Sequence, residues 1–209
     1  MAISQDYLKP LGVIPVVVIE EASDAVAIAN ALQKGGIKAI EVTLRTPAAL
    51  DALRAIKAEC EGLELGVGTV INSQQLDAVA EIGVDFVISP GFTPNLLKHA
   101  QNVGVDMLPG VASVSEIMVG MEHGLSCFKL FPAVAVGGIP LLKSFGGPLP
   151  QISFCPTGGL TIDNFTDFLS LPNVACVGGS WLVPAEAVAE KNWQAITHIA
   201  LKTTSKILG

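Results

Sequence analysis

One lysine of this chain stands inside an apolar, β-like run, Cys127-Phe128-Lys129-Leu130-Phe131-Pro132. Burial disfavours the charged form of an ammonium group, and only a neutral amine can attack a ketone and form an imine. Taken alone, Lys129 is more simply explained as a strand-end lysine whose ammonium group reaches solvent along its own methylene stem. A nucleophilic role for this lysine therefore depends on the groups that the rest of the chain places around it.

Short apolar segments alternate with helix-period segments along the whole chain, which is typical of repeated βα units around a parallel sheet. The predicted strands are short and largely apolar, as parallel strands covered on both faces are. They are Val13 to Ile19, Ala39 to Leu44, Glu64 to Val70, Phe86 to Ser89, Asp106 to Gly110, Cys127 to Phe131, Ile152 to Pro156 and Val174 to Gly178. Eight such units without a linker predict one α/β domain over residues 1–209, a (β/α)8 TIM barrel.

Signals at helix ends agree with this division. Thr46-Pro47 and Thr93-Pro94 each place a cap residue before a first-turn proline, and Ser113-x-x-Glu116 is a capping box. A short covering helix is predicted before the first strand, from Gln5 to Leu11. An open doubly wound sheet is the alternative fold, but Glu20-Glu21-Ala22-Ser23 stands where such a sheet carries its Gly-x-Gly-x-x-Gly turn.

Composition limits the classes of partner. Half of the residues are apolar, and 15% are charged, whereas charged residues usually make up about 25% of a chain. The excess of apolar surface predicts an oligomer. The chain has no run of about 18 apolar residues, so no membrane span is expected. A net charge of −7 argues against nucleic-acid binding, which needs a basic surface to neutralise phosphates. With so few arginines, anionic small molecules must be held largely by backbone amides.

The cysteines and the start of the chain indicate a cytoplasmic protein. Cys60, Cys127, Cys155 and Cys176 lack metal-type spacing, and we interpret them as reduced thiols. The first residues have neither the charged nor the apolar region of a signal peptide. The three histidines fall in predicted helices and no two of them share ligand spacing, so no catalytic metal is expected.

The predicted barrel brings a carboxylate to Lys129. Active sites of such barrels lie at the C-terminal ends of the strands, and interior layers are built from alternate strands. Glu41, Thr43 and Arg45 share one face of the second strand, so Glu41 and Lys129 are expected to face each other in one layer as a general base and a nucleophile. A buried ion pair kept for structure is the alternative, although such a pair stabilises a fold weakly at best.

Glycines end the last two strands, where barrels commonly bind phosphate. Pro156-Thr157-Gly158-Gly159 follows the seventh strand and Gly178-Gly179-Ser180 the eighth. Glycines let backbone N–H groups approach an anion, although turns also use them, and Ser180 has an alternative role as a helix cap. Thr69 ends the third strand among small residues that leave room for a ligand, or else it is an ordinary strand residue.

Taken together, the motifs resemble the 2-keto-3-deoxy-6-phosphogluconate (KDPG) / 4-hydroxy-2-oxoglutarate (KHG) aldolase family over nearly the whole chain. They occur in order as Glu41-Val42-Thr43-Leu44-Arg45-Thr46, Gly66-x-Gly68-Thr69-Val70, Ile88-Ser89-Pro90-Gly91, Phe128-Lys129-Leu130-Phe131-Pro132-Ala133, Cys155-Pro156-Thr157-Gly158-Gly159 and Gly178-Gly179-Ser180-Trp181-Leu182-Val183. The resemblance implies a homotrimeric (β/α)8 class I aldolase that uses neither a metal nor a cofactor.

The resemblance also implies a role for each site residue. Lys129 forms the Schiff base and Glu41 transfers protons. The substrate is held by the pyruvate contacts Arg45 and Thr69 and by the phosphate contacts Gly158, Gly159, Gly179 and Ser180. By its position, Phe131 is expected to keep the amine dry, and Thr157 to contact the aldehyde portion of the substrate. Val134 and Ala112-Ser113 depart from the family's usual residues, which leaves the contacts around the lysine loop open.

The expected reaction is cleavage of KDPG to pyruvate and glyceraldehyde 3-phosphate, with KHG as a further substrate. The 6-phosphogalactonate epimer is an alternative substrate, because stereochemical choice depends on side-chain placement within about 1 Å. Two other classes share the glycine loops: a phosphate-binding barrel isomerase or synthase that forms no imine, and a trimeric binding protein without turnover. Trapping with borohydride and pyruvate separates the first class from an aldolase, and the pairing of Glu41 with Lys129 argues against the second.

Overall fold

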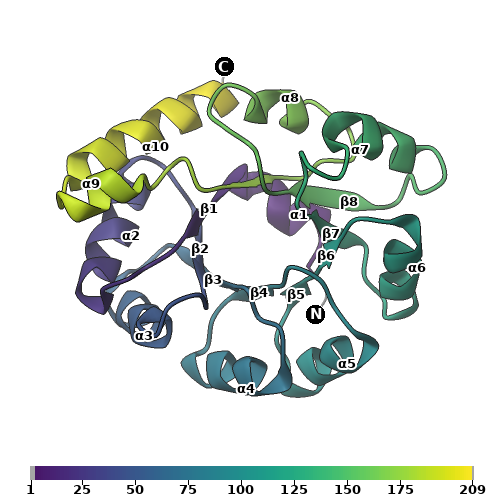
Figure 1. Cartoon of the computed structure of the whole chain (residues 1–209), viewed down its shortest axis with the longest axis horizontal. Helices are drawn as coiled ribbons and strands as arrows, with labels where there is room; N and C mark the ends of the chain where they lie inside the picture. Colours follow the sequence, from purple (N-terminus) through teal and green to yellow (C-terminus); the bar gives the residue numbers. More distant parts are fainter. Residues whose placement is uncertain (1–2, 209) are drawn as a thin grey trace.

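The computed structural model describes residues 3–208 and shows a ring of parallel strands surrounded by helices (Figure 1). One sheet has six strands in the order β5-β4-β3-β2-β1-β9, and a second has three in the order β6-β7-β8. The strands are β1 Val13–Val17, β2 Ala39–Thr43, β3 Glu64–Gly68, β4 Phe86–Ile88, β5 Met107–Leu108, β6 Gly110–Val111, β7 Cys127–Leu130, β8 Ser153–Pro156 and β9 Val177–Gly179.

Two features join these sheets into one barrel. Parallel bridges from Phe154 to Val174 and from Thr157 to Gly178 connect β8 to β9. On the other side, β5 and β6 are two parts of one strand interrupted by Pro109, which has no N–H to donate to a neighbouring strand. The carbonyl oxygen of Pro109 still accepts a hydrogen bond of 2.9 Å from the Lys129 N–H. The predicted (β/α)8 barrel is therefore confirmed, with its fifth strand divided at a proline.

Helices surround the barrel, and along the chain most strands are followed by a helix (Figure 1). They are η2 Ala22–Asp24, α2 Ala25–Lys34, α3 Ala49–Glu59, α4 Ser73–Ile82, α5 Pro94–Val103, α6 Val114–Glu122, α7 Gly138–Gly146, α8 Phe165–Leu169, α9 Ala185–Ala189 and α10 Trp193–Leu208. No helix within residues 3–208 combines the length and the apolar character that crossing a bilayer would require.

The predicted covering segment forms α1 Gln5–Leu8 and the 3-10 helix η1 Lys9–Leu11. Leu8 and Leu11 join a buried cluster with residues of the barrel interior. The Tyr7 hydroxyl donates to Glu64 Oε2 at 2.9 Å, and the Tyr7 ring meets the ring of Phe86 edge to face. Burial, followed by the hydrogen bond to Glu64, raises the pKa of Tyr7 well above its ordinary value, so this hydroxyl remains a donor. The segment therefore covers one end of the barrel.

Two apolar clusters divide the core. The larger one fills the space between the sheet and the outer helices, and the smaller one fills the barrel interior with residues such as Ile14, Phe86, Cys127 and Cys155. All four cysteines are free thiols, and burial raises the pKa of Cys127 to about 11. Cys127 and Cys155 thus act as small hydrophobic residues in the interior layer, as the sequence predicted.

The structure corrects two sequence predictions of local structure. Thr46 does not cap a helix, because α3 begins at Ala49 and the Thr46 hydroxyl instead donates to the Ile19 carbonyl. The last strand begins at Val177 and not at Val174, because Val174 forms only a single bridge to β8 before the chain turns to pair with β1. The other predicted caps are confirmed: Thr93 accepts from Leu96 N–H, and Ser113 and Glu116 form a capping box.

Candidate active site

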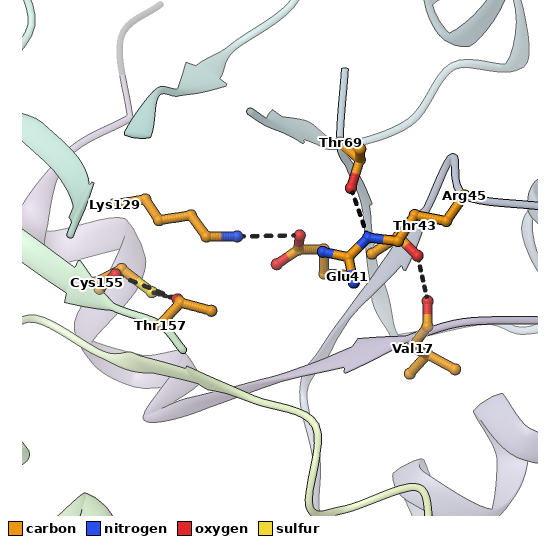
Figure 2. A network of polar contacts seen from close by, with 8 residues as sticks. All are labelled: Val17, Glu41, Thr43, Arg45, Thr69, Lys129, Cys155 and Thr157. Carbon is orange, nitrogen blue, oxygen red and sulfur yellow. Dashed lines mark hydrogen bonds and ion pairs between the residues drawn. The ribbon is translucent and has the colours of Figure 1, made fainter. Parts of the chain in front are cut away.

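A lysine and a glutamate meet across the barrel interior. Every residue of β2 and of β7 is buried, and period-2 geometry turns Glu41 and Lys129 inward from these strands. Lys129 Nζ lies 3.3 Å from Glu41 Oε1, and the two side chains are only 5% and 2% exposed. Figure 2 shows the two side chains extending toward one another from opposite sides. The expectation that they face each other is confirmed.

An aromatic ring lies beside the lysine amine. The centroid of the Phe131 ring is 5.0 Å from Lys129 Nζ, a distance at which a ring face attracts a cation. Phe131 directly follows β7 and is half-buried, so it stands at the edge of the site. Its placement fits the predicted role of limiting water around the amine.

A second polar contact lies at the ends of β2 and β3. Arg45 Nε donates to Thr69 Oγ1 at 3.2 Å, so the two expected pyruvate contacts are brought together. Between Glu41 and Arg45, the Thr43 hydroxyl donates to the Val17 carbonyl at 3.1 Å and ties β2 to β1 (Figure 2). Thr43 thus holds the strand that carries both charged residues.

Thr69 has a left-handed backbone, with φ of +65°. A β-branched residue rarely adopts this conformation, which costs roughly 1–2 kcal/mol and is typical of functional sites. The neighbouring glycines do not leave room for a ligand, contrary to the prediction. The Phe86 ring lies against Gly66, and the Glu41 carboxylate lies against Gly68.

The loops after β8 and β9 lie side by side, joined by the bridge from Thr157 to Gly178. Thr157 is buried, and its hydroxyl donates to the Cys155 carbonyl at 3.3 Å. Gly158 and Gly159 have φ of +100° and +82°, a region that L side chains avoid. The expected phosphate loops are therefore adjacent. The positive φ of Gly158 and Gly159 is by itself enough to require glycine at these two positions.

Ser180 is exposed and does not cap a helix, because α9 begins at Ala185 after Pro184. The alternative of a capping role is thus wrong. Gly179 has a packing reason for lacking a side chain, since a Cβ there would overlap the ring of Trp181. That ring packs on Phe165, and its Nε1 donates to Thr203 Oγ1 at 3.2 Å.

Val134, which departs from the family pattern, lies against the expected phosphate loop. A Cβ built on Gly159 would be 2.7 Å from Val134 Cβ. The Val134 N–H also donates to the Gly158 carbonyl at 3.0 Å. The departure therefore places an apolar side chain beside the expected anion site.

Sequence reasoning missed three features of the site. Thr43 was noted only as a member of a strand face, and its bond to β1 depends on the tertiary register. The left-handed backbone of Thr69 has no sequence signal. Ser89, at the end of β4, is fully buried, and its hydroxyl is the one buried side-chain polar atom within residues 3–208 without a hydrogen-bond partner. Across the same residues, no group of three or more His, Cys, Asp or Glu side chains is arranged to hold a metal ion.

Comparison with known proteins shows the family of this chain. The family model described as KDPG and KHG aldolase matches residues 4–199. The chain belongs to the KDPG and KHG aldolase family. Over 99% of its length it is 47% identical to the 2-dehydro-3-deoxy-phosphogluconate aldolase of Pseudoalteromonas atlantica, of which the match covers 96%. Over 90% of its length it is 48% identical to the KHG/KDPG aldolase of Escherichia coli, of which the match covers 88%.

Solved structures of family members have the same fold. The KDPG aldolase of Legionella pneumophila, with pyruvate captured as a covalent carbinolamine, superposes with a TM-score of 0.93 at 47% identity, covering 96% of this chain and 98% of that one. The aldolase of Zymomonas mobilis with 3-phosphoglycerate gives a TM-score of 0.90 at 44% identity, covering 96% and 94% of the two chains.

Because the backbone of Thr69 is strained, replacing this residue should affect protein stability and substrate binding in different ways. Thr69→Gly relieves about 1–2 kcal/mol of left-handed strain but adds about 0.5–1 kcal/mol of unfolded-state entropy, so we expect the free energy of unfolding to stay equal or rise slightly. The KM for the keto-acid substrate should rise, because the hydroxyl that holds Arg45 is lost. Urea denaturation and steady-state kinetics measure the two effects. Thr69→Ser, which keeps the hydroxyl, is the control, and an equal rise in its KM would contradict the role of the hydroxyl.

Proposed function

We propose that this protein is a class I aldolase that cleaves KDPG to pyruvate and glyceraldehyde 3-phosphate, the cleavage step of the Entner–Doudoroff pathway, and that it also cleaves KHG to pyruvate and glyoxylate. The observation that carries the proposal is the buried pair of Lys129 and Glu41, 3.3 Å apart between the facing strands β7 and β2. The names of the family relatives and the pyruvate carbinolamine of the Legionella enzyme support the same reaction.

The first step needs a neutral amine, and the pair provides a route to one. A proton passes from Lys129 Nζ to Glu41 Oε1 across the existing contact, and Nζ then attacks the C2 ketone of the substrate. Glu41 returns a proton to the carbinolamine oxygen as water leaves, which produces a protonated imine. The Phe131 ring, 5.0 Å from Nζ, is proposed to limit competing water.

The imine then accepts the electrons of the bond that breaks. Glu41 removes the proton of the C4 hydroxyl, the C3–C4 bond breaks, and its electron pair moves into the imine to form an enamine as the aldehyde leaves. The enamine takes a proton at C3, and hydrolysis of the resulting imine releases pyruvate and restores Lys129. One carboxylate can serve each proton transfer, because it already lies within 3.3 Å of the amine that carries the substrate.

Arg45 and Thr69 are proposed to hold the keto-acid end of the substrate. The contact with Thr69 uses Nε of Arg45, so the terminal nitrogens of the guanidinium can bind a carboxylate in the bidentate manner that arginine favours. At the other end, Gly158, Gly159, Gly179 and Ser180 are proposed to hold the phosphate, and Thr157 to contact the aldehyde portion. The 3-phosphoglycerate in the Zymomonas structure supports an anion site in this family.

We further propose that the protein is a homotrimer that acts in the cytoplasm without a cofactor. The apolar composition and the family resemblance support the assembly. The names of the relatives favour the phosphogluconate substrate over the phosphogalactonate epimer. Cleavage assays with both epimers and with KHG decide among the substrates, and an enzyme without imine chemistry would fail the trapping experiment below.

Lys129 should be the residue that forms the imine. Pyruvate followed by borohydride should reduce the imine and add mass to the peptide that contains Lys129. Lys129→Arg should lose nearly all turnover, because a guanidinium stays protonated and cannot act as the nucleophile. Peptide mass spectrometry makes the assignment, and labelling of Lys143 or Lys98 instead would overturn it.

Glu41 should transfer protons without being needed for the fold. Glu41→Gln keeps the shape of the side chain but removes the base, so kcat should fall by about 10² to 10⁴, the usual share of general acid–base catalysis. Circular dichroism should remain that of the parent protein. Unchanged turnover would reassign the base to another group.

Ser180 should select the phosphate. Ser180→Ala removes a hydroxyl donor to a charged oxygen, so the KM for KDPG should rise by about 10-fold or more, while the KM for the unphosphorylated KHG changes little. Ser180 gives a cleaner test than Gly179, where any side chain would first displace Trp181. An equal loss on both substrates would mean that the loop shapes the barrel without binding the phosphate.

A further inference from the structure

We propose that Gly68 is a positioning residue for Glu41. Because Gly68 has no side chain, it leaves a space, here called the slot, in which the Glu41 carboxylate lies against Lys129. The inference rests on the proposed roles of Glu41 and Lys129 and extends them to the neighbouring strand. It assigns a function in the reaction to a residue that carries no reactive group.

The slot is defined by the register of β2 and β3. Glu41 pairs with Gly66 and Thr43 pairs with Gly68, so the inward-directed glutamate side chain can lie across β3 at Gly68. A Cβ built on Gly68 would lie 2.0 Å from Glu41 Oε1, 2.7 Å from its Cδ and 2.8 Å from its Cγ. Oε1 is also the atom that lies 3.3 Å from Lys129 Nζ. A side chain at Gly68 would therefore displace the oxygen that pairs with the nucleophile.

The requirement for glycine at position 68 concerns space and not backbone conformation. Gly68 belongs to the regular strand β3 and is absent from the positive-φ glycines of the described chain, so an alanine could adopt its backbone. The carboxylate also has little freedom to retreat. Its side chain is only 2% exposed, and the ring of Phe86 already lies where a Cβ on Gly66 would be, at 2.1 Å. Gly68 and Lys129 thus fix the carboxylate from two sides.

Displacement of this oxygen should affect proton transfer more than substrate binding. A general base must stand within hydrogen-bond reach of the proton that it removes, whereas the keto-acid end is held by Arg45 and Thr69. We expect Gly68→Ala to lower kcat by about 10² or more, with a KM for KDPG within a few-fold of the parent value. Borohydride should still trap pyruvate on Lys129 at long incubation, because the nucleophile is retained.

Gly66→Ala is the matched control. It is on the same strand and is equally crowded, but its Cβ would meet Phe86 in the barrel interior and not Glu41. It should lower the thermal midpoint, while kcat per folded molecule falls much less than in Gly68→Ala. Equal losses of kcat in the two folded variants would mean that crowding of β3 alone slows the enzyme, and would overturn the proposal.

A double-mutant cycle tests the slot even if Gly68→Ala folds poorly. In the parent, Gly68→Ala should lower the thermal midpoint by about 2 to 12 °C, the range expected for overpacking in a chain of this size. In a Glu41→Ala background the carboxylate is absent and the methyl group has room, so the same change should have little effect on the midpoint or on residual turnover. Equal losses in both backgrounds would show that Gly68 does not act through Glu41. Failure of Lys129 to form an imine in the parent would instead contradict the proposed function and leave the stability cycle interpretable.

Discussion

A carboxylate and an amine lie in contact inside this barrel, where water is largely excluded, and the buried strands around them hold the two groups together. Removing two such ions from water costs several kcal/mol each, and their mutual attraction offsets this only when the geometry is good. The 3.3 Å contact between Lys129 and Glu41 is held by fully buried strands on both sides. Replacing both ions with apolar side chains of similar volume is often neutral or even stabilising. The pair is therefore better explained by chemistry than by stability.

The two ends of the site differ in their physical character. The reacting end is buried, with an aromatic ring 5.0 Å from the amine and an apolar cluster filling the barrel interior. The residues proposed for binding, Arg45 and Ser180, are exposed at the rim. Electrostatic interactions are stronger where water is excluded, so the proposed roles would place bond breaking in the dry part and the charged ends of the substrate near solvent. In this proposal the chemistry lies on strands β2 and β7, and recognition lies on residues that follow β2 and β9.

The sequence could predict the fold and the facing pair because both follow from periodicity. Alternating apolar segments identify the strands, and the interior layers of a barrel then place Glu41 opposite Lys129. The sequence could not predict the details that depend on the third dimension. The donation from Thr43 to Val17 needs the β1–β2 register, and the contact of Glu41 with Gly68 needs the actual path of a side chain. The glycines of β3 were visible, but without coordinates their space was assigned to a ligand when it belongs to Phe86 and Glu41. The break at Pro109 was also not predictable, because it depends on the pairing of β5 with β4 and of β6 with β7.

Trp181 has a consequence for how ligand binding can be observed. Its ring touches the position of a Gly179 side chain in the proposed phosphate loop, packs on Phe165 and is fixed by a hydrogen bond to Thr203 in α10. The second tryptophan, Trp193, begins α10 outside the barrel. Indole emission responds to nearby charge and to solvent access, so the unmodified protein contains a fluorescent reporter beside its proposed anion site. Occupation of that site can be followed by light without a coupled assay or an added label.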